Sequence, residues 1–495
     1  MRSFRTDRAI AAAAVLLLAG CTVGPDFERP PPPEVLGVTP DPPSATVATP
    51  GVPGGAAQRF VAGADISGEW WTLFHSKTLN ALIDEALANS PDFKAAQAAL
   101  RGAHEVVLAQ RGAYFPTVTA GLSASRQQQS LALAPVPNSN TFQYSLITPQ
   151  VSVSYTPDVF GLNRRTVETL QAQEQGVRYQ ELATYTALTA NVAVAAIQES
   201  SIDEQVRTSR ALIDTETRLL KILEYQRAKG YSSGLDVAAQ KSQLAQAEAT
   251  LPPLLKQAIQ LRDELSVLVG RFPSQAQGAS LAVSDLELPQ NLPLSLPSAL
   301  VEQRPDVLQA EANLRAANAQ LGVAAANRLP NIELTGNIGS TALAIGQLFT
   351  PGTGFWTVGA GLTGPIFDGN ALLHKERASR AAYDQAVQQY RSTVLKAFQD
   401  VADTLAALEQ DSAALNAAAA AADASRTTFD LSQRQLKDGY IGYPAFLGAE
   451  QAYQQTQINL VQAEASRFAD TAALFQALGG GWWRRGDLAG TEHDR

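Results

Sequence analysis

The chain repeats itself at a separation of about 210 residues, and this doubling limits what it can fold into more than any single motif does. Asn89-Ser90-Pro91-Asp92 in the first half is matched by Gln303-Arg304-Pro305-Asp306 in the second, and Gly230-Tyr231 is matched by Gly439-Tyr440. An ordered series of matches indicates that one structural unit occurs twice. We expect each unit to contain a helix, two strands, a very long helix, a tip and a return helix.

Two short segments in each repeat alternate apolar and polar residues, which predicts strands with one apolar face. In the first segment Val118, Ala120 and Leu122 share that face. Such strands suit a half-buried soluble sheet or a transmembrane barrel equally well. We favour the barrel because the flanking helices are rich in Ala, Gln and Ser and offer no apolar layer to cover the sheet. The strands are expected at about residues 117–126, 146–156, 331–341 and 355–364.

A sheet of only four strands leaves backbone groups unpaired at both edges, and each such group costs several kcal/mol in lipid. Closure therefore requires further copies of the chain. The strand pattern alone does not choose among barrels made by two, three or four copies.

The long helices are expected from about Leu162 to Ala228 and from about Ala371 to Lys437, neither interrupted by proline. At 1.5 Å per residue each reaches roughly 100 Å. Val206, Ile213 and Leu220 stand seven residues apart, the repeat of helices that coil side by side. A composition dominated by Ala and Gln suits the wall of a water-filled tube, and an ordinary coiled-coil rod is the alternative.

The N-terminus has the order of a secretory signal, with Arg2, Arg5 and Arg8 before an apolar run from Ala9 to Ala19 that is too short to span a bilayer. Leu18-Ala19-Gly20-Cys21 follows and resembles the lipobox of bacterial lipoproteins. We expect the Cys21 thiol, the only one in the chain, to carry a lipid anchor. Ordinary signal cleavage beside a bystander thiol is the alternative.

Composition shifts divide the rest of the chain. Residues 25–55 are rich in Pro, Gly, Ala, Val and Thr without periodicity, so we expect an extended tether there and regular structure only from about Glu69. The expected organisation is a signal peptide over 1–20, a lipid-anchored extended N-terminal segment over 21–68, a first repeat over 69–285, a second repeat over 286–482 and a flexible tail over 483–495.

Stretches along nearly the whole mature chain resemble the TolC-like outer-membrane efflux proteins, and specifically their NodT/OprM-type lipoproteins. These stretches are Cys21-Thr22-Val23-Gly24-Pro25-Asp26-Phe27, Trp70-Trp71-Thr72-Leu73-Phe74, Leu82-Ile83-Asp84-Glu85-Ala86-Leu87, Arg304-Pro305-Asp306-Val307, Pro365-Ile366-Phe367-Asp368-Gly369 and Gly479-Gly480-Gly481-Trp482.

The resemblance implies an α+β fold in a homotrimer: a twelve-stranded outer-membrane β-barrel in the lipid bilayer, continued by a long periplasmic α-helical barrel. It also implies two partners, a periplasmic adaptor protein and an inner-membrane transporter of the resistance-nodulation-division type. By resemblance to enteric lipoproteins, Thr22 after the lipidated cysteine favours the outer membrane.

The same resemblance places adaptor docking and the aperture at the two tips of the long helices. Gly230 and Gly439 suit helix ends, where a left-handed residue is needed. Ser233 or Asp236 suits the cap of the return helix, and Pro444 suits its first turn. The candidate tip and gate residues are Gly230, Tyr231, Asp236, Gly439, Tyr440, Ile441 and Tyr443.

Turn chemistry alone also accounts for those residues. Better-known relatives close the aperture with rings of aspartates, whereas Ile441 and Gly448 stand at the corresponding places here. Asp236 is the remaining candidate for such a ring, so an acidic and a hydrophobic gate both stay open.

Other classes of site are disfavoured. A net charge of -9 and no Lys/Arg run argue against nucleic acid as a partner. The dinucleotide-like Gly359-Ala360-Gly361-Leu362-Thr363-Gly364 is followed by Pro365, where that motif needs a helix. Four scattered histidines and one cysteine indicate no metal site. No nucleophile stands beside a recognisable base, so neither catalysis nor a cofactor is expected.

The sequence thus predicts a passive exit duct that conducts drugs or other small toxic compounds delivered by the inner-membrane transporter. A duct for polypeptides in type I secretion is one alternative. A lipid-tethered periplasmic scaffold without a pore is another.

Overall fold

The computed structural model describes residues 23–31, 33, 37–40, 43–128, 130, 143–276, 278, 281–294 and 297–488. It divides into two compact units. Unit 1 comprises Met1–Arg29, Leu100–Val177 and Ala310–Tyr390, and unit 2 comprises Pro30–Ala99, Arg178–Gln309 and Arg391–Arg495. Both units draw on both halves of the chain.

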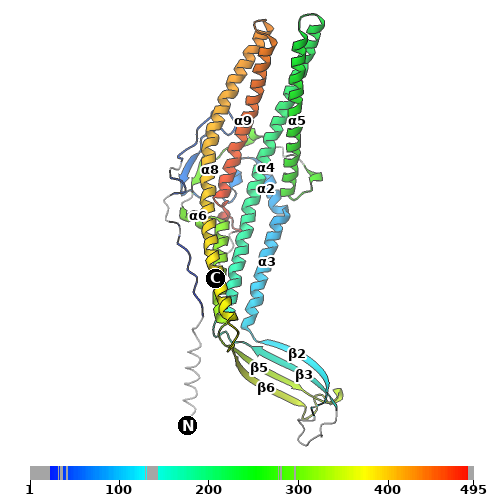
Figure 1. The fold of residues 1–495 in the computed structure, drawn as a ribbon, viewed down its shortest axis with the longest axis vertical. Helices are drawn as coiled ribbons and strands as arrows, with labels where there is room; N and C mark the ends of the chain where they lie inside the picture. The colour runs from blue at the N-terminus through cyan, green and yellow to red at the C-terminus, as the bar shows by residue number, and fades with distance from the viewer. Residues whose placement is uncertain are drawn as a thin grey trace. The chain divides into compact units, whose positions relative to one another are not determined.

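Unit 1 contains an antiparallel four-stranded sheet in the order β2-β3-β5-β6 (Figure 1). Its strands are β2 (Thr117–Gln127), β3 (Tyr144–Tyr155), β5 (Asn331–Ser340) and β6 (Gly354–Thr363). Each repeat supplies one hairpin, and the two hairpins join where β3 pairs with β5. The strands follow the alternation of apolar and polar residues in the sequence.

Four helices run through both units, and two of them are very long. They are α3 (Pro91–Arg111), α4 (Leu162–Ala228), α7 (Pro305–Ala326) and α8 (Ala371–Lys437). The predicted bounds of both long helices are confirmed, and each has 67 residues. Across the described residues, no helix combines the length and apolarity needed to cross a membrane.

Unit 2 contains two helical hairpins, α4 with α5 and α8 with α9, whose turns lie at the same end of the unit (Figure 1). The remaining helices and strands of this unit are β1 (Arg59–Ala62), α2 (Lys77–Asn89), α5 (Gly234–Leu268), β4 (Asn291–Leu294), α6 (Pro297–Gln303) and α9 (Tyr443–Ala477). Short 3-10 turns occur at Trp70–Phe74, Gly112–Tyr114, Pro273–Gln275, Val283–Asp285, Ile345–Gln347 and Trp482–Arg484.

Aromatic side chains hold the core of unit 2. Trp70 is fully buried and stacks on Phe475 of α9, with ring centroids 5.2 Å apart. Phe74, also fully buried, contacts the ring of Phe468. Each buried aromatic ring contributes a large apolar area, so this cluster fixes the chain before α2 against α9.

The expectation that regular structure starts only near Glu69 is wrong. Strand β1 pairs in parallel with β4, and the side chain of Gln58 is fully buried. The reason is the guanidinium of Arg467 on α9, which donates to the carbonyl oxygens of Gly54 and Ala56 and to Oγ1 of Thr46. Backbone acceptors hold this segment, and a search for apolar periodicity does not detect them.

The prediction of a flexible tail over residues 483–495 is also wrong for residues 483–488. The guanidinium of Arg485 lies over the ring of Tyr185, 5.5 Å from its centroid, and pairs with Asp487 at 2.8 Å. Trp483 donates its indole N–H to Asp65. These polar contacts fix the chain through residue 488, and residues 489–495 lie outside the described part.

Candidate functional site: an apolar sheet face and two helical tips

One face of the unit 1 sheet is apolar and uncovered in the single chain. The strand register places Ala120 beside Val151, Val151 beside Ile338, and Ile338 beside Trp356. Ile338 is 64% exposed and Trp356 is 75% exposed. Val118, Leu122, Val153, Leu334, Val358 and Leu362 are exposed on the same face. A contiguous apolar surface of this extent marks an interaction site with lipid or protein.

The opposite face of the sheet is polar. Thr119 lies beside Ser152, Ser152 beside Asn337, and Asn337 beside Thr357. The hydroxyl of Ser154 on this side donates to the carboxylate of Glu333 at 2.8 Å. A sheet with one lipid-compatible face and one hydrated face matches the alternation of an outer-membrane strand.

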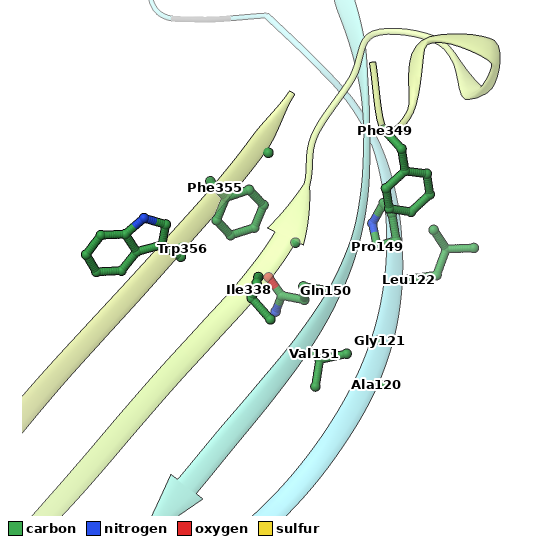
Figure 2. A pocket seen from close by; sticks show the side chains of 12 residues that line it. Ala120, Gly121, Leu122, Pro149, Gln150, Val151, Ile338, Phe349, Phe355 and Trp356 are labelled. Atoms are coloured by element: carbon green, nitrogen blue, oxygen red, sulfur yellow. The ribbon is translucent and has the colours of Figure 1, made fainter. Parts of the chain in front are cut away.

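The sheet is hollowed where the β5–β6 connection folds back toward β2. Figure 2 shows the ring of Phe349 beside Pro149 and Leu122, with Ile338 and Trp356 farther along the hollow. The hollow encloses about 780 Å³ and is open to the outside. Its lining is apolar apart from Gln150 and backbone, so it lacks the convergent polar groups that orient a small-molecule ligand.

Both sheet edges are unpaired within the described chain, because β2 and β6 each have a neighbour on one side only. Glycines of the dinucleotide-like stretch, Gly359 and Gly361, lie inside β6 and pair with Thr335 and Glu333. They are ladder residues of the sheet, and no helix begins there.

The first tip is a tight turn between α4 and α5. Gly230 has a φ of 81°, the left-handed conformation that ends a helix. Ser233 caps α5, since its hydroxyl accepts from the Asp236 N–H at 3.1 Å. The Asp236 carboxylate accepts from the Ser233 N–H at 2.9 Å and from the Ser233 hydroxyl at 2.8 Å, and these two hydrogen bonds lower the Asp236 pKa. The Asp236 side chain therefore serves a capping box.

The second tip joins α8 to α9 in the same manner. Gly439 has a φ of 75°, and Pro444 occupies the first turn of α9. Tyr231 and Tyr440 occupy equivalent places on the two tips and are 83% and 81% exposed. Tyr443 differs, because its hydroxyl points inward and donates to Oε1 of Gln240 on α5 at 2.9 Å.

Sequence reasoning missed a buried polar cluster behind the tips. Gln240 is fully buried, and its amide donates to the main-chain oxygen of Glu216 on α4 at 3.0 Å and to the Glu216 carboxylate. Glu450 on α9 is fully buried, and neither of its carboxylate oxygens has a partner. One sequence signal could have revealed the buried glutamate. Glu450 lies three residues after Leu447 and four after Phe446, which places it on the same apolar face of the helix.

Arg304 and Cys21 both belong to the stretches that resemble the family. Arg304 is buried, and its guanidinium donates to the Ala477 carbonyl at 2.9 Å, to Asp306 at 2.7 Å and to Asp400 at 2.9 Å. It fastens α9 and α8 to the start of α7, which is a structural role. Cys21 lies outside the described residues, so its lipidation stays a prediction.

Comparison with known proteins gives a consistent family. The family model described as "Outer membrane efflux protein" matches residues 82–271 and 296–480. The probable efflux pump outer membrane protein TtgC of Pseudomonas putida is 30% identical over 96% of this chain and 95% of its own length.

Solved structures agree in fold. The outer-membrane channel OprN superposes with a TM-score of 0.83 at 24% identity, over 94% of this chain and 100% of that one. The open state of the MtrE outer membrane channel of Neisseria gonorrhoeae gives a TM-score of 0.78 at 26% identity, over 94% and 99% of the two chains.

Proposed function

This chain belongs to the outer membrane efflux protein family, and we propose that three copies of it close a twelve-stranded barrel around a water-filled exit duct. The protein is the outer-membrane component of an efflux pump and extends into the periplasm. Its proposed cargo is drugs, solvents or other small toxic compounds. A relative of similar length is named a toluene efflux pump outer membrane protein.

The observation that carries the proposal is the combination of an exposed apolar face with two open sheet edges. In water the apolar face is costly, at roughly 25 cal/mol for each Å² of apolar surface. In lipid the same face is favourable, but each unpaired edge group costs several kcal/mol. Lipid around the sheet removes the first cost, and pairing β6 of one copy with β2 of the next removes the second, which leaves the Thr119 and Asn337 face toward a hydrated lumen.

The proposed partners follow from the family. A periplasmic adaptor docks on the tips around Tyr231 and Tyr440, and an inner-membrane transporter of the resistance-nodulation-division type supplies the energy. The duct is passive and catalyses no reaction. A lipid on Cys21 attaches each copy to the outer membrane, and the apolar face then holds the barrel in the bilayer independently of that anchor.

Conductance tests the pore directly. Full-length protein in planar bilayers is expected to give discrete current steps, and the absence of current from protein shown to be inserted would favour the tethered scaffold. Cargo needs a second measurement, namely dye and drug accumulation in a strain that lacks this gene, with and without complementation. Lower accumulation on complementation supports small-molecule efflux. Unchanged accumulation with restored export of a polypeptide would identify a type I secretion duct.

A further inference from the structure

At two levels of the interface between α4 and α9 in unit 2, a buried glutamate of α9 lies near a glutamate of α4, which is buried at the first level and partly exposed at the second. Glu450 and Glu464 of α9 are 0% and 9% exposed. Glu216 of α4 acts electrostatically on Glu450, and Glu204 of α4 acts on Glu464. Gln462 donates to Gln205 between the same two helices at 3.2 Å, which fixes their antiparallel register between the two levels. The two pairs thus belong to one helix–helix interface.

Within the part of the chain that the structure describes, Glu216 is the one charged group that acts electrostatically on Glu450. Glu216 faces it from α4, Gln240 contributes an uncharged amide from α5, and Tyr443 contributes a phenol from α9 itself. The Gln240 amide is committed to Glu216, and the Tyr443 hydroxyl is committed to Gln240. Both Glu450 oxygens are left without a donor, and an unpaired buried charge costs several kcal/mol.

The Glu464 level has basic residues nearby that are already engaged. Arg207 of α4 pairs with Glu204. Arg467, one turn along α9, donates to the Leu408 carbonyl at 3.0 Å and to the segment around Thr46. The charge that acts on Glu464 is that of Glu204, which is of the same sign. At both levels the cost of burying the α9 carboxylate comes first and the nearby glutamate charge adds to it, and adding a proton removes both.

We propose that the α4–α9 interface is a proton-binding seam, in which Glu450 and Glu464 each take up a proton to hold the two helical hairpins together. Loss of these protons leaves two buried carboxylates charged, each near a glutamate of α4, and favours separation of α9 from α4. The ligand is the proton itself, drawn from the surrounding medium. The seam operates in the folded chain whether or not the chain forms a pore.

The direction of the pH effect follows from the pKa values. Burial, followed by the charge of the opposing glutamate, raises the pKa of Glu450 and of Glu464 from 4.5 to about 7. The closed seam therefore binds protons that a separated, hydrated seam releases. The stabilisation that the two protons give to the closed seam is complete below pH 4.5. It declines as the pH rises to about 7 and changes no further above that value.

The test is peptide-resolved hydrogen exchange of the full-length protein in detergent between pH 5 and pH 8. Rates are corrected for the intrinsic pH dependence with an unstructured reference peptide. Protection of peptides covering residues 443–464 is expected to fall at least tenfold between pH 5 and pH 7.5. Each proton that is released on opening changes the equilibrium between the closed and the separated seam by up to about tenfold per pH unit.

The double variant Glu450→Gln with Glu464→Gln keeps both shapes and removes both titrations, so its corrected protection is expected to stay within about twofold over that pH range. Glu248→Gln makes the same chemical change at an exposed position of α5 and is expected to follow the wild type. Constant protection in the wild type, or an equal fall in the double variant, would overturn the proposal. Neither readout depends on conductance, so failure of the pore and failure of the seam are distinguishable.

Discussion

The hydroxyl of Tyr443 on α9 donates a 2.9 Å hydrogen bond to Oε1 of the fully buried Gln240 on α5. It links the two helical hairpins of unit 2 just behind their tips. Gln240 in turn donates to Glu216 on α4, so one amide joins three helices. A contact of this kind is expected to control how easily the hairpins separate.

Replacing Tyr443 with Phe removes the donor and leaves a buried amide oxygen unsatisfied, at a cost of about 1–3 kcal/mol. We expect exchange of the amides near Gln240 to accelerate by roughly 5- to 150-fold, measured by hydrogen exchange at one pH. Tyr440→Phe is the matched control, because Tyr440 is 81% exposed and its hydroxyl loss is expected to leave exchange unchanged. Equal effects of the two variants would contradict a role for the hydrogen bond.

The two faces of the sheet are expected to respond differently to charge. Val151→Arg places a guanidinium on the apolar face, where lipid contact makes it unfavourable by about 2–4 kcal/mol. Ser152→Arg, the next residue, places the same group on the polar face. We expect the first variant to lose heat-resistant oligomers and outer-membrane recovery, and the second to keep both. Similar recovery of both variants would argue against a lipid-facing apolar side.

The buried Arg467 is expected to hold the N-terminal segment against α9. Arg467→Met keeps the apolar stem but removes the donors to Leu408 and Thr46, at about 1–3 kcal/mol for each acceptor left buried. We expect proteolytic cleavage within residues 43–58 to rise on the order of 100-fold. Arg426→Met on the exposed side of α8 serves as the control, and equal cleavage rates in the two variants would show that the segment is held elsewhere.

The pairing of α8 with α9 is expected to depend on pH through Asp411. Burial, together with the neighbouring carboxyl of Asp470, raises the pKa of Asp411 from 3.8 to about 7. The folded chain therefore retains a proton that the unfolded chain releases. The contribution of Asp411 to the free energy of unfolding declines as the pH rises from about 4 to about 7.

The free energy of unfolding of the wild type is expected to fall between pH 5 and pH 8. Asp411→Asn is expected to make that fall smaller by on the order of 1 kcal/mol, a figure reduced because the Asp411 carboxyl is partly exposed. Denaturant midpoints at the two pH values measure this difference. Asp423→Asn on the exposed side of α8 is the control. A pH dependence unchanged by Asp411→Asn would rule out this residue as its source.

The lipid anchor is tested at the N-terminus. Cys21→Ala is expected to strand the precursor at the inner membrane, because no thiol remains to receive the acyl chains that anchor the mature protein. Membrane fractionation measures the distribution, and Thr22→Ser, which keeps the cysteine, is the control. Normal outer-membrane recovery of the alanine variant would show that lipidation is dispensable.

Periodic signals made most of the fold predictable. The alternation through Val118, Ala120 and Leu122 predicted strands with one apolar face, and uninterrupted helical sequence predicted α4 and α8 with their observed bounds. Turn chemistry predicted the roles of Gly230 and Ser233 at the first tip. These signals are local, because strand alternation, helix propensity and capping each depend on neighbouring residues.

Contacts between distant segments were not predictable from such patterns. Arg467 fixes the segment around Gly54 through main-chain oxygens, which leave no mark in the sequence. Glu450 and Glu216 are more than 200 positions apart, and only the packing of α9 on α4 brings their charges together. The sequence by itself determined the elements and their doubled order. Tertiary structure alone decided which polar groups are buried, because burial depends on what a distant helix places opposite each side chain.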